Sequence, residues 1–250
     1  MITSPKVSLA AFVLAVGLLL FSSIGGARAA LTYYSENYST RVEMFDIGVT
    51  LQENGKSLSW RNYDTNASDG TWDESAGRLL STMLPKGEDL KIGAKYTEEL
   101  DVRNSGTINQ YVRVNIYKYW VDADGNKLRS LSPDLIKLNL VNLKKDWILD
   151  EEASTPERTV LYYSKLLESG TVTPLFADSL IIDEMVATKV TQTSTEENGY
   201  TTITTTYDYD GVSFCVEAKV DAVQEHNAED AIWSAWGRRV AVKNNVLRLK

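Results

Sequence analysis

The stretch KYTEELDVRNSGTINQYVRVNIYKYW, residues Lys95–Trp120, predicts two β-strands joined by a turn. Apolar residues alternate with polar or aromatic ones in both halves, and a period of two places alternate side chains on one face of a strand. Between the halves, Asn104-Ser105-Gly106 supplies residues that tolerate the left-handed backbone of a tight connection. The stretch therefore predicts sandwich strands with one buried face, formed by Leu100, Val102, Val112, Val114 and Ile116.

Similar patterns recur along the rest of the chain. Strands are predicted at residues 44–51, 136–143, 159–167, 173–182 and 213–224. In the last of these, Val216, Ala218 and Val220 alternate with the charged residues Glu217, Lys219 and Asp221. Residues 55–93 are irregular and predict a long insertion with a short helix near 74–83, while residues 228–236 predict a C-terminal helix and residues 238–250 a solvated terminal strand. The spacing is typical of an all-β protein, a jelly-roll or immunoglobulin-like β-sandwich with loop insertions.

Residues 190–207, VTQTSTEENGYTTITTTY, predict a projecting hairpin around the turn residues Asn198-Gly199. Threonine occupies both faces, so core packing cannot hold this segment and its sheet edges are expected to be open. Two interpretations remain, a hairpin with a role in contacts and one that is only solvated.

The first 29 residues are predicted to be a signal peptide. Lys6 precedes the apolar run 7–24, and Ala27-Arg28-Ala29 matches the small-x-small pattern of a signal peptidase site, which places the cut between Ala29 and Ala30. The alternative is an uncleaved membrane anchor, because a span needs about 20 apolar residues. Cleavage leaves residues 30–250 as one β-sandwich domain, secreted and without a stable membrane span.

The new N-terminus would begin with a short strand-prone segment that contains Leu31, Tyr33 and Tyr34. This segment has no hairpin partner nearby in the sequence. An apolar strand without a local partner must fold back on its own sandwich or pair with another sheet edge. We interpret it as a candidate assembly strand.

Charge limits the possible partners. The chain carries a formal net charge of −8 at pH 7. Removing residues 1–29 removes two basic residues, Lys6 and Arg28, and no acid, so the mature charge is −8 − 2 = −10. Nucleic acid is therefore not expected as a partner, because binding to phosphates needs a clustered positive surface.

The residues for familiar enzyme chemistry are sparse. The chain has one cysteine, Cys215, and one histidine, His226, so neither a two-histidine zinc motif nor a serine triad with a Gly-x-Ser-x-Gly elbow is present. Asp122 begins a weak match to a calcium loop, but counting from it puts Pro133 at the twelfth position, where a glutamate is needed. No enzyme activity, cofactor or metal is expected.

Acidic runs and aromatic residues leave two weaker alternatives. Carboxylates at 98–99, 150–152 and 183–184 would serve a glycosidase only if two of them faced one cleft. We expect these runs to be solvated. Tryptophan and tyrosine side chains would suit a sugar-stacking platform, but core packing explains most of the tryptophans.

Several segments in order resemble the TasA/camelysin family of exported proteins, which a SipW-type signal peptidase processes. They are GGARA followed by ALTYYS, FDIGVTL, the segment from LPKGEDLKIG to YVRVNI, Trp147, VLYYSKLLESGTVTPLF at 160–176, and CVEAKVDAVQ with AEDAIWSAWG. The resemblance covers most of the mature chain.

The resemblance implies a secreted subunit of the cell surface or biofilm extracellular matrix, from a Gram-positive bacterium. It also implies fibres of this chain or of related matrix subunits, in which the N-terminal strand of one subunit completes the sheet of the next. Some members are labelled metallopeptidases, but this chain has no recognisable set of zinc ligands. The alternative to a structural subunit is a monomeric surface adhesion or carbohydrate-binding module.

Overall fold

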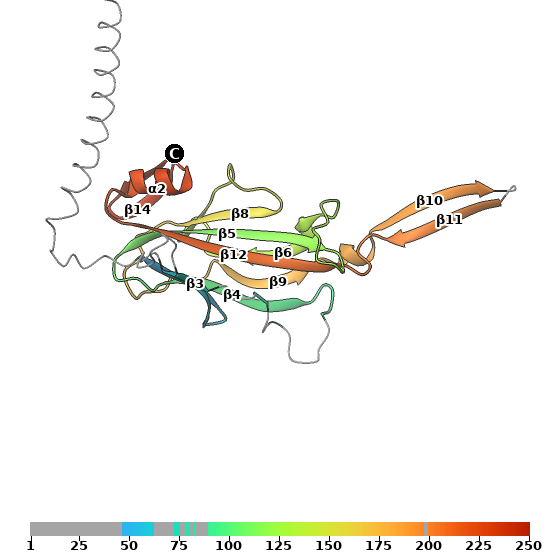
Figure 1. The fold of residues 1–250 in the computed structure, drawn as a ribbon, viewed down its shortest axis with the longest axis horizontal. Helices are drawn as coiled ribbons and strands as arrows, with labels where there is room; N and C mark the ends of the chain where they lie inside the picture. The colour runs from blue at the N-terminus through green and yellow to red at the C-terminus, as the bar shows by residue number, and fades with distance from the viewer. Residues whose placement is uncertain (1–46, 63–72, 76–78, 81–82, 84–89, 198–199) are drawn as a thin grey trace, which may run out of the picture. The chain divides into compact units, whose positions relative to one another are not determined.

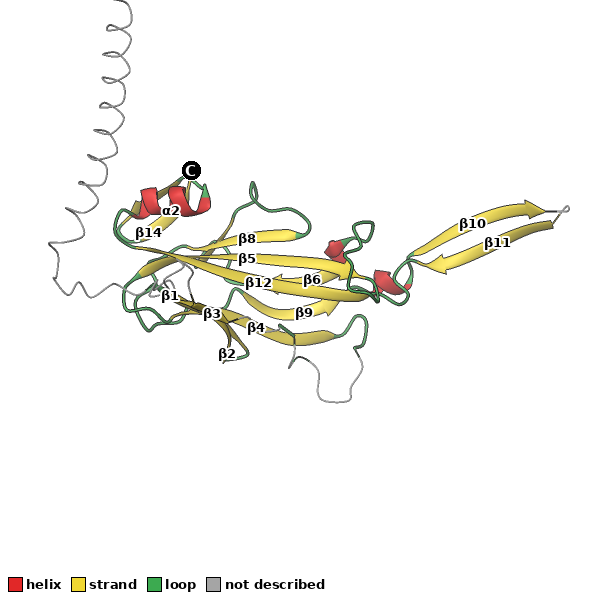
Figure 2. Cartoon of the chain, in the orientation of Figure 1, coloured by secondary structure: helices red, strands yellow, loops and turns green. Residues whose placement is uncertain are grey.

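The computed structural model describes residues 47–62, 73–75, 79–80, 83, 90–197 and 200–250. Two antiparallel sheets form the body of this part of the chain (Figures 1 and 2). The six-stranded sheet has the order β3 (Asp73–Ser75), β2 (Lys56–Asn62), β1 (Gly48–Glu53), β4 (Lys95–Asn104), β9 (Ala177–Ile182), β6 (Ile136–Leu140). The four-stranded sheet has the order β12 (Ser213–Gln224), β5 (Gln110–Val121), β8 (Arg158–Tyr163), β7 (Trp147–Leu149).

The main core lies between these two sheets. Leu51 and Leu100 come from the six-stranded sheet and pack in one apolar cluster with Val114 and Val216 from the four-stranded sheet. The alternating burial predicted for residues 112–116 holds, since Val112, Val114 and Ile116 are at most 1% exposed. The prediction of an all-β sandwich with a short C-terminal helix is confirmed.

The two halves of residues 95–120 enter different sheets. β4 pairs with β1 and β9, whereas β5 pairs with β12 and β8, so the connection between them crosses from one sheet to the other. The predicted turn lies between β4 and β5, but none of residues 104–106 uses the left-handed backbone that they would tolerate. The Asn104 side chain shapes the connection instead, accepting from the Gly106 N–H at 3.0 Å and donating to the Ile108 carbonyl at 2.8 Å.

The four-stranded sheet is covered on its outer face as well. The C-terminal elements α2 (Ala228–Trp236), β13 (Val240–Lys243) and β14 (Val246–Leu249) pack there in a second apolar cluster. Ile232 and Leu247 from this segment are fully buried with Tyr111 and Tyr162 of the sheet, at 0–1% exposure. The terminal segment 238–250 is therefore not a solvated strand but a hairpin that covers the sheet.

The insertion at residues 55–93 was predicted to be irregular, and the structure corrects this for residues 55–62 and 73–75, while residues 63–72, 76–78, 81–82 and 84–89 lie outside the described residues. Asn54 and Gly55 adopt positive φ values of 49° and 75° and turn β1 into β2, which β3 extends. The short helix predicted near 74–83 is wrong at its start, because Glu74 and Ser75 belong to β3. The two strands β2 and β3 thus widen the six-stranded sheet.

Other predicted elements are found at or near their expected bounds. β12 and α2 match the predictions, and Gly237, with φ 65°, ends the helix. Two 3-10 helices, η1 (Pro133–Leu135) and η2 (Glu184–Ala187), complete the described elements with β10 (Val190–Glu197) and β11 (Tyr200–Tyr207). Residues 122–126 form a turn, in which Asp122 Oδ1 accepts from the N–H groups of Asp124 and Asn126 at 3.0 and 2.8 Å.

Candidate functional sites

The residues predicted for export and assembly cannot be placed in the fold. Ala27, Ala29 and Ala30 of the predicted cleavage site lie outside the described residues, and so do Leu31, Tyr33 and Tyr34 of the candidate assembly strand. These predictions stay predictions. The described residues instead show which sheet edges are available to a pairing strand.

β12 is the longest edge strand of the two main sheets. Its 12 residues pair with β5 from Ser213 to Gln224, and no strand among the described residues pairs with its other side. The other edge strands of these sheets are shorter: β7 and β3 have 3 residues each and β6 has 5. An open strand edge offers a row of backbone donors and acceptors to another chain.

The hydrogen bonds of β5 show which groups of β12 face this open edge. The N–H groups of Gln110 and Lys118 donate to the carbonyls of Leu167 and Glu157, on the β8 side of β5. Even-numbered residues of β5 therefore direct their backbone groups away from β12. Because opposed residues in an antiparallel pair are bonded alternately, the even-numbered residues of β12 direct their N–H and C=O groups outward. Among these even-numbered residues of β12, Val216, Val220 and Ala222 direct their side chains into the core.

A pair of buried carboxyl groups lies between β1 and β4. Glu98 has the same inward orientation as Leu100 and is 0% exposed, and Glu53, opposite Leu100, is 4% exposed. The Leu80 N–H donates to Glu53 Oε1 at 2.6 Å. The expectation that the acidic run at 98–99 is solvated is therefore wrong for Glu98, although Glu99 is exposed.

Burial governs the ionisation of this pair. Loss of solvation, then a hydrogen bond and charge repulsion from Glu53, raise the pKa of Glu98 to about 8. Charged carboxylates are costly in an apolar medium, and two of them side by side cannot readily ionise together. Glu98 is therefore largely protonated at neutral pH, and the pair makes the stability of the β1–β4 region depend on pH.

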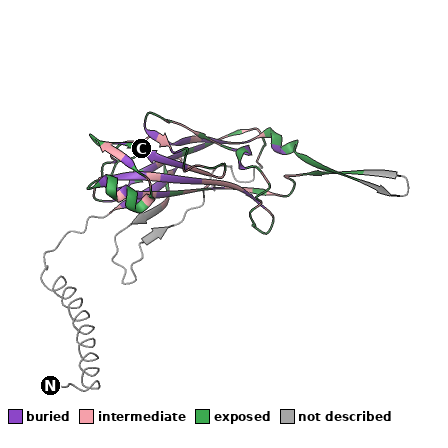
Figure 3. Cartoon of the chain, turned by 90° about the horizontal axis from the view of Figure 1, so that it is seen from above, coloured by how far each residue is buried: buried purple, intermediate pink, exposed green. Residues whose placement is uncertain are grey.

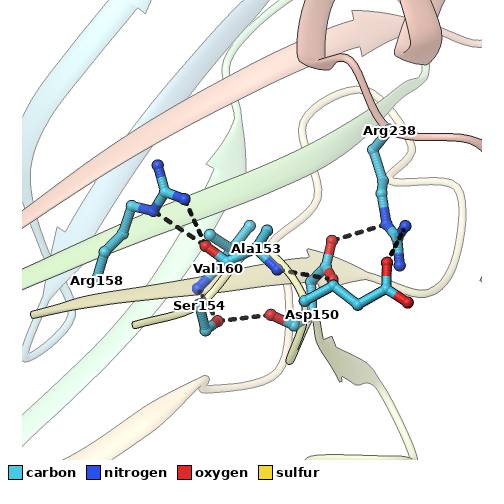
Figure 4. A network of polar contacts seen from close by, with 7 residues as sticks. Asp150, Ala153, Ser154, Arg158, Val160 and Arg238 are labelled. Carbon is cyan, nitrogen blue, oxygen red and sulfur yellow. Dashed lines mark hydrogen bonds and ion pairs between the residues drawn. The ribbon is translucent and has the colours of Figure 1, made fainter. Parts of the chain in front are cut away.

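A second buried carboxylate joins the C-terminal segment to the body of the protein (Figure 4). Asp150 is 1% exposed and its Oδ2 lies 2.9 Å from Arg238 Nε, while Arg238 Nη1 reaches Glu152 Oε2 at 2.8 Å. The Asp150 carbonyl accepts from Ser154 Oγ at 2.6 Å, and Ser154 Oγ accepts from the Val160 N–H at 3.0 Å. This network fastens the chain after α2 to the connection between β7 and β8.

No local sequence pattern predicted this network. Asp150 stands in an acidic run that we expected to be solvated, and Arg238 begins the basic segment 238–250, which we expected to be a solvated terminal strand. Lys250 of the same tail contacts Glu229 at 3.1 Å, and the Arg239 guanidinium lies 4.1 Å from the ring centre of Trp233. Several basic side chains of the tail thus have partners within the chain.

The remaining candidate residues are placed as follows. His226 is exposed in the turn before α2, as expected of a surface loop. Cys215 is half-buried on β12, opposite Tyr119. Trp120 and Trp147 are buried in the core, while Trp233 is 46% exposed. In the described part of the chain, no cluster of three or more histidine, cysteine or acidic residues could hold a metal ion. No helix there reaches the length and apolar character of a membrane span.

A search of family models, curated proteins and solved structures gives no match for the chain.

Proposed function

We propose that this chain is an exported structural subunit of the cell surface or the biofilm extracellular matrix. In this proposal the N-terminal strand of one subunit, which contains Leu31 and Tyr33, pairs with the open edge of β12 in the next subunit. The observation that supports it most is the 12-residue edge itself, which has no paired strand in the described part on its outer side. The TasA/camelysin resemblance supports the same function.

The chemistry of the edge suits a donor strand. β-Strand addition gains affinity from main-chain hydrogen bonds and selectivity from alternate side chains. Leu31 and Tyr33 lie two residues apart and would point the same way in a strand. Burying both against a neighbour would contribute on the order of 3 to 5 kcal/mol before the cost of ordering the strand.

The predicted export step has a simple test. Mass spectrometry of the exported protein is expected to find Ala30 as its first residue. An exported chain that retains the apolar run 7–24 would contradict cleavage.

The assembly step is tested by chains that begin at Ala30 and at Thr40. The shorter chain is expected to lose fibres in electron microscopy and light scattering but to keep its melting temperature, because the compact unit that holds both sheets begins at Phe45. A Tyr33→Asp variant of the longer chain should also lose fibres. Thr32→Asp, which places the charge on the opposite face of the strand, is the matched control and should retain them.

Two results would overturn the donor-strand proposal. One is fibre formation by the chain that begins at Thr40. The other is a chain beginning at Ala30 that stays monomeric at high concentration and at every pH tried, which would favour a monomeric adhesion module.

A further inference from the structure

The threonine-rich hairpin β10–β11 is a separate two-stranded sheet with an unbroken register. Its pairs run from Val190 opposite Tyr207 to Glu197 opposite Tyr200, which confirms the predicted hairpin. Residues 190–194 and 203–207 are exposed, so both faces of the shaft contact solvent (Figure 3). A two-stranded hairpin of this kind is at best marginally stable in water. A further paired strand would stabilise it.

One hydrogen bond fixes which backbone groups of the hairpin face outward. The Asp208 N–H donates to the Lys189 carbonyl at 3.0 Å, and these residues are opposed one position beyond Val190 and Tyr207. Bonded and non-bonded pairs alternate along antiparallel strands. Odd-numbered residues of β10 therefore bond to β11, and even-numbered residues direct their N–H and C=O groups to the free edge of β10.

The free edge of β10 lacks the usual protection against pairing. Proteins guard exposed edges with lysine, proline or bulges. Residues 190–207 contain no lysine, arginine or proline, and the β10–β11 register has no shift. In this segment the charged residues are Glu196 and Glu197, next to the turn, while Lys189 stands at the base of β10.

We propose that the free edge of β10 pairs antiparallel with β10 of a second copy of this chain, about a two-fold axis at Thr193. This register sets Val190 opposite Glu196 and Gln192 opposite Ser194. Every residue of β10 whose backbone groups face the free edge is then opposed by such a residue of the second copy. The result is a continuous four-stranded sheet made of two hairpins. This contact goes beyond the proposed function because it does not use the N-terminal strand.

The charges of the hairpin select this register. With Thr193 on the axis, Lys189 of one copy lies opposite Glu197 of the other, and this occurs twice in the dimer. Lys189 is exposed and belongs to none of the ion pairs found among the described residues. Opposite charges at directly opposed positions stabilise a sheet, and like charges destabilise it. If the free edges of two β11 strands paired in the corresponding register, Tyr200 would lie opposite Asp208. That contact would gain no pair of opposite charges.

A disulfide cross-link tests the register directly. On the two-fold axis the two copies of residue 193 form a non-bonded pair with Cα atoms about 4.5 Å apart, within the range that a disulfide spans. The test uses a chain with Cys215→Ser, which removes the native thiol, and Tyr33→Asp, which removes fibre formation by the N-terminal strand. In this background, Thr193→Cys is expected to give covalent dimers under mild oxidation.

Thr204→Cys is the matched control for the cross-link. Thr204 is opposite Thr193 within the hairpin and equally exposed, but two strands would separate it from its counterpart in the other copy. It should therefore give no dimers. Absence of dimers with Thr193→Cys, or equal amounts from both variants, would overturn the proposal.

Charge reversal tests the pairing by an independent route. Lys189→Glu alone and Glu197→Lys alone should each weaken dimerisation about tenfold in sedimentation experiments, because two favourable pairs become two repulsive ones. The combined variant should restore it.

Proline gives a third comparison. Ser194→Pro removes an N–H that faces the β10 edge and should abolish the dimer. Ile203→Pro removes the equivalent N–H at the β11 edge and should leave the dimer intact. A dimer that survives Ser194→Pro, or a combined charge variant that stays monomeric, contradicts the proposed contact.

Discussion

Replacing Glu98 by glutamine is expected to remove a large pH dependence from the stability of this protein. The pKa of Glu98 is about 8 in the folded chain, raised chiefly by burial, against an ordinary value of 4.5. A group whose pKa is raised by folding favours the folded state most at low pH, below its unfolded pKa. That contribution is lost as the pH rises from about 4.5 to about 8.

The size of the effect follows from the same shift. Each pKa unit corresponds to 1.36 kcal/mol, so the full loss is of order 5 kcal/mol. Glutamine stays neutral at all these pH values and can still donate a hydrogen bond toward Glu53. The difference in unfolding free energy between the variant and the parent chain should therefore grow by about that amount from pH 4.5 to pH 9, in favour of the variant.

Urea unfolding at several pH values measures this difference. Glu99→Gln is the matched control, because Glu99 is the exposed neighbour of Glu98 on the same strand. The difference in unfolding free energy between Glu99→Gln and the parent chain should change little over the same pH range. A Glu98→Gln variant whose advantage is the same at pH 5 and pH 9 would show that Glu98 does not titrate as a buried carboxyl.

Arg238→Met is expected to destabilise the folded chain by about 3 to 5 kcal/mol, because it leaves the Asp150 carboxylate buried without its cationic partner. Asp150 is 1% exposed, and Arg238 Nε lies 2.9 Å from its Oδ2. For a chain of this size the loss corresponds to a fall in melting temperature of roughly 10 °C. Calorimetry or urea unfolding of the exported chain measures it.

Two further variants separate charge pairing from packing. Adding Asp150→Asn to Arg238→Met should recover most of the lost stability, since the buried charge is gone while Oδ1 still accepts from the Ala153 N–H. Arg239→Met is the control, and it should cost less than about 1 kcal/mol because Arg239 only stacks on the exposed Trp233. Equal losses for Arg238→Met and Arg239→Met would contradict the role given to the buried pair.

Local sequence patterns predicted those strands and helices whose bounds depend only on residues within the same segment. The alternation in residues 213–224 predicted β12, and residues 228–236 predicted α2, with the bounds that the structure has. The pattern of residues 190–207 around the sequence Asn198-Gly199 predicted the hairpin of β10 and β11 correctly. In each case the backbone preference and the side-chain pattern agree within one short segment.

Long-range packing was not predictable in the same way. Nothing local shows that β4 and β5 enter different sheets, because alternation is the same in either arrangement. The alternation of β5 places Tyr111 on the face opposite the main core, yet the distant Ile232 and Leu247 bury it. The inward direction of Glu98 and the pairing of Asp150 with Arg238 likewise depend on segments far apart in the sequence.

Amide hydrogen exchange of β12 tests the proposed assembly most directly. In the monomer, the outward N–H groups of even-numbered residues such as Val216, Ala218 and Val220 have no strand to donate to in the described part. Those of Cys215, Glu217 and Lys219 already face β5. Assembly through the N-terminal strand should slow exchange at the even-numbered positions alone and leave the odd-numbered ones unchanged. Fibres in which the even-numbered amides of β12 exchange as they do in the monomer would contradict the account.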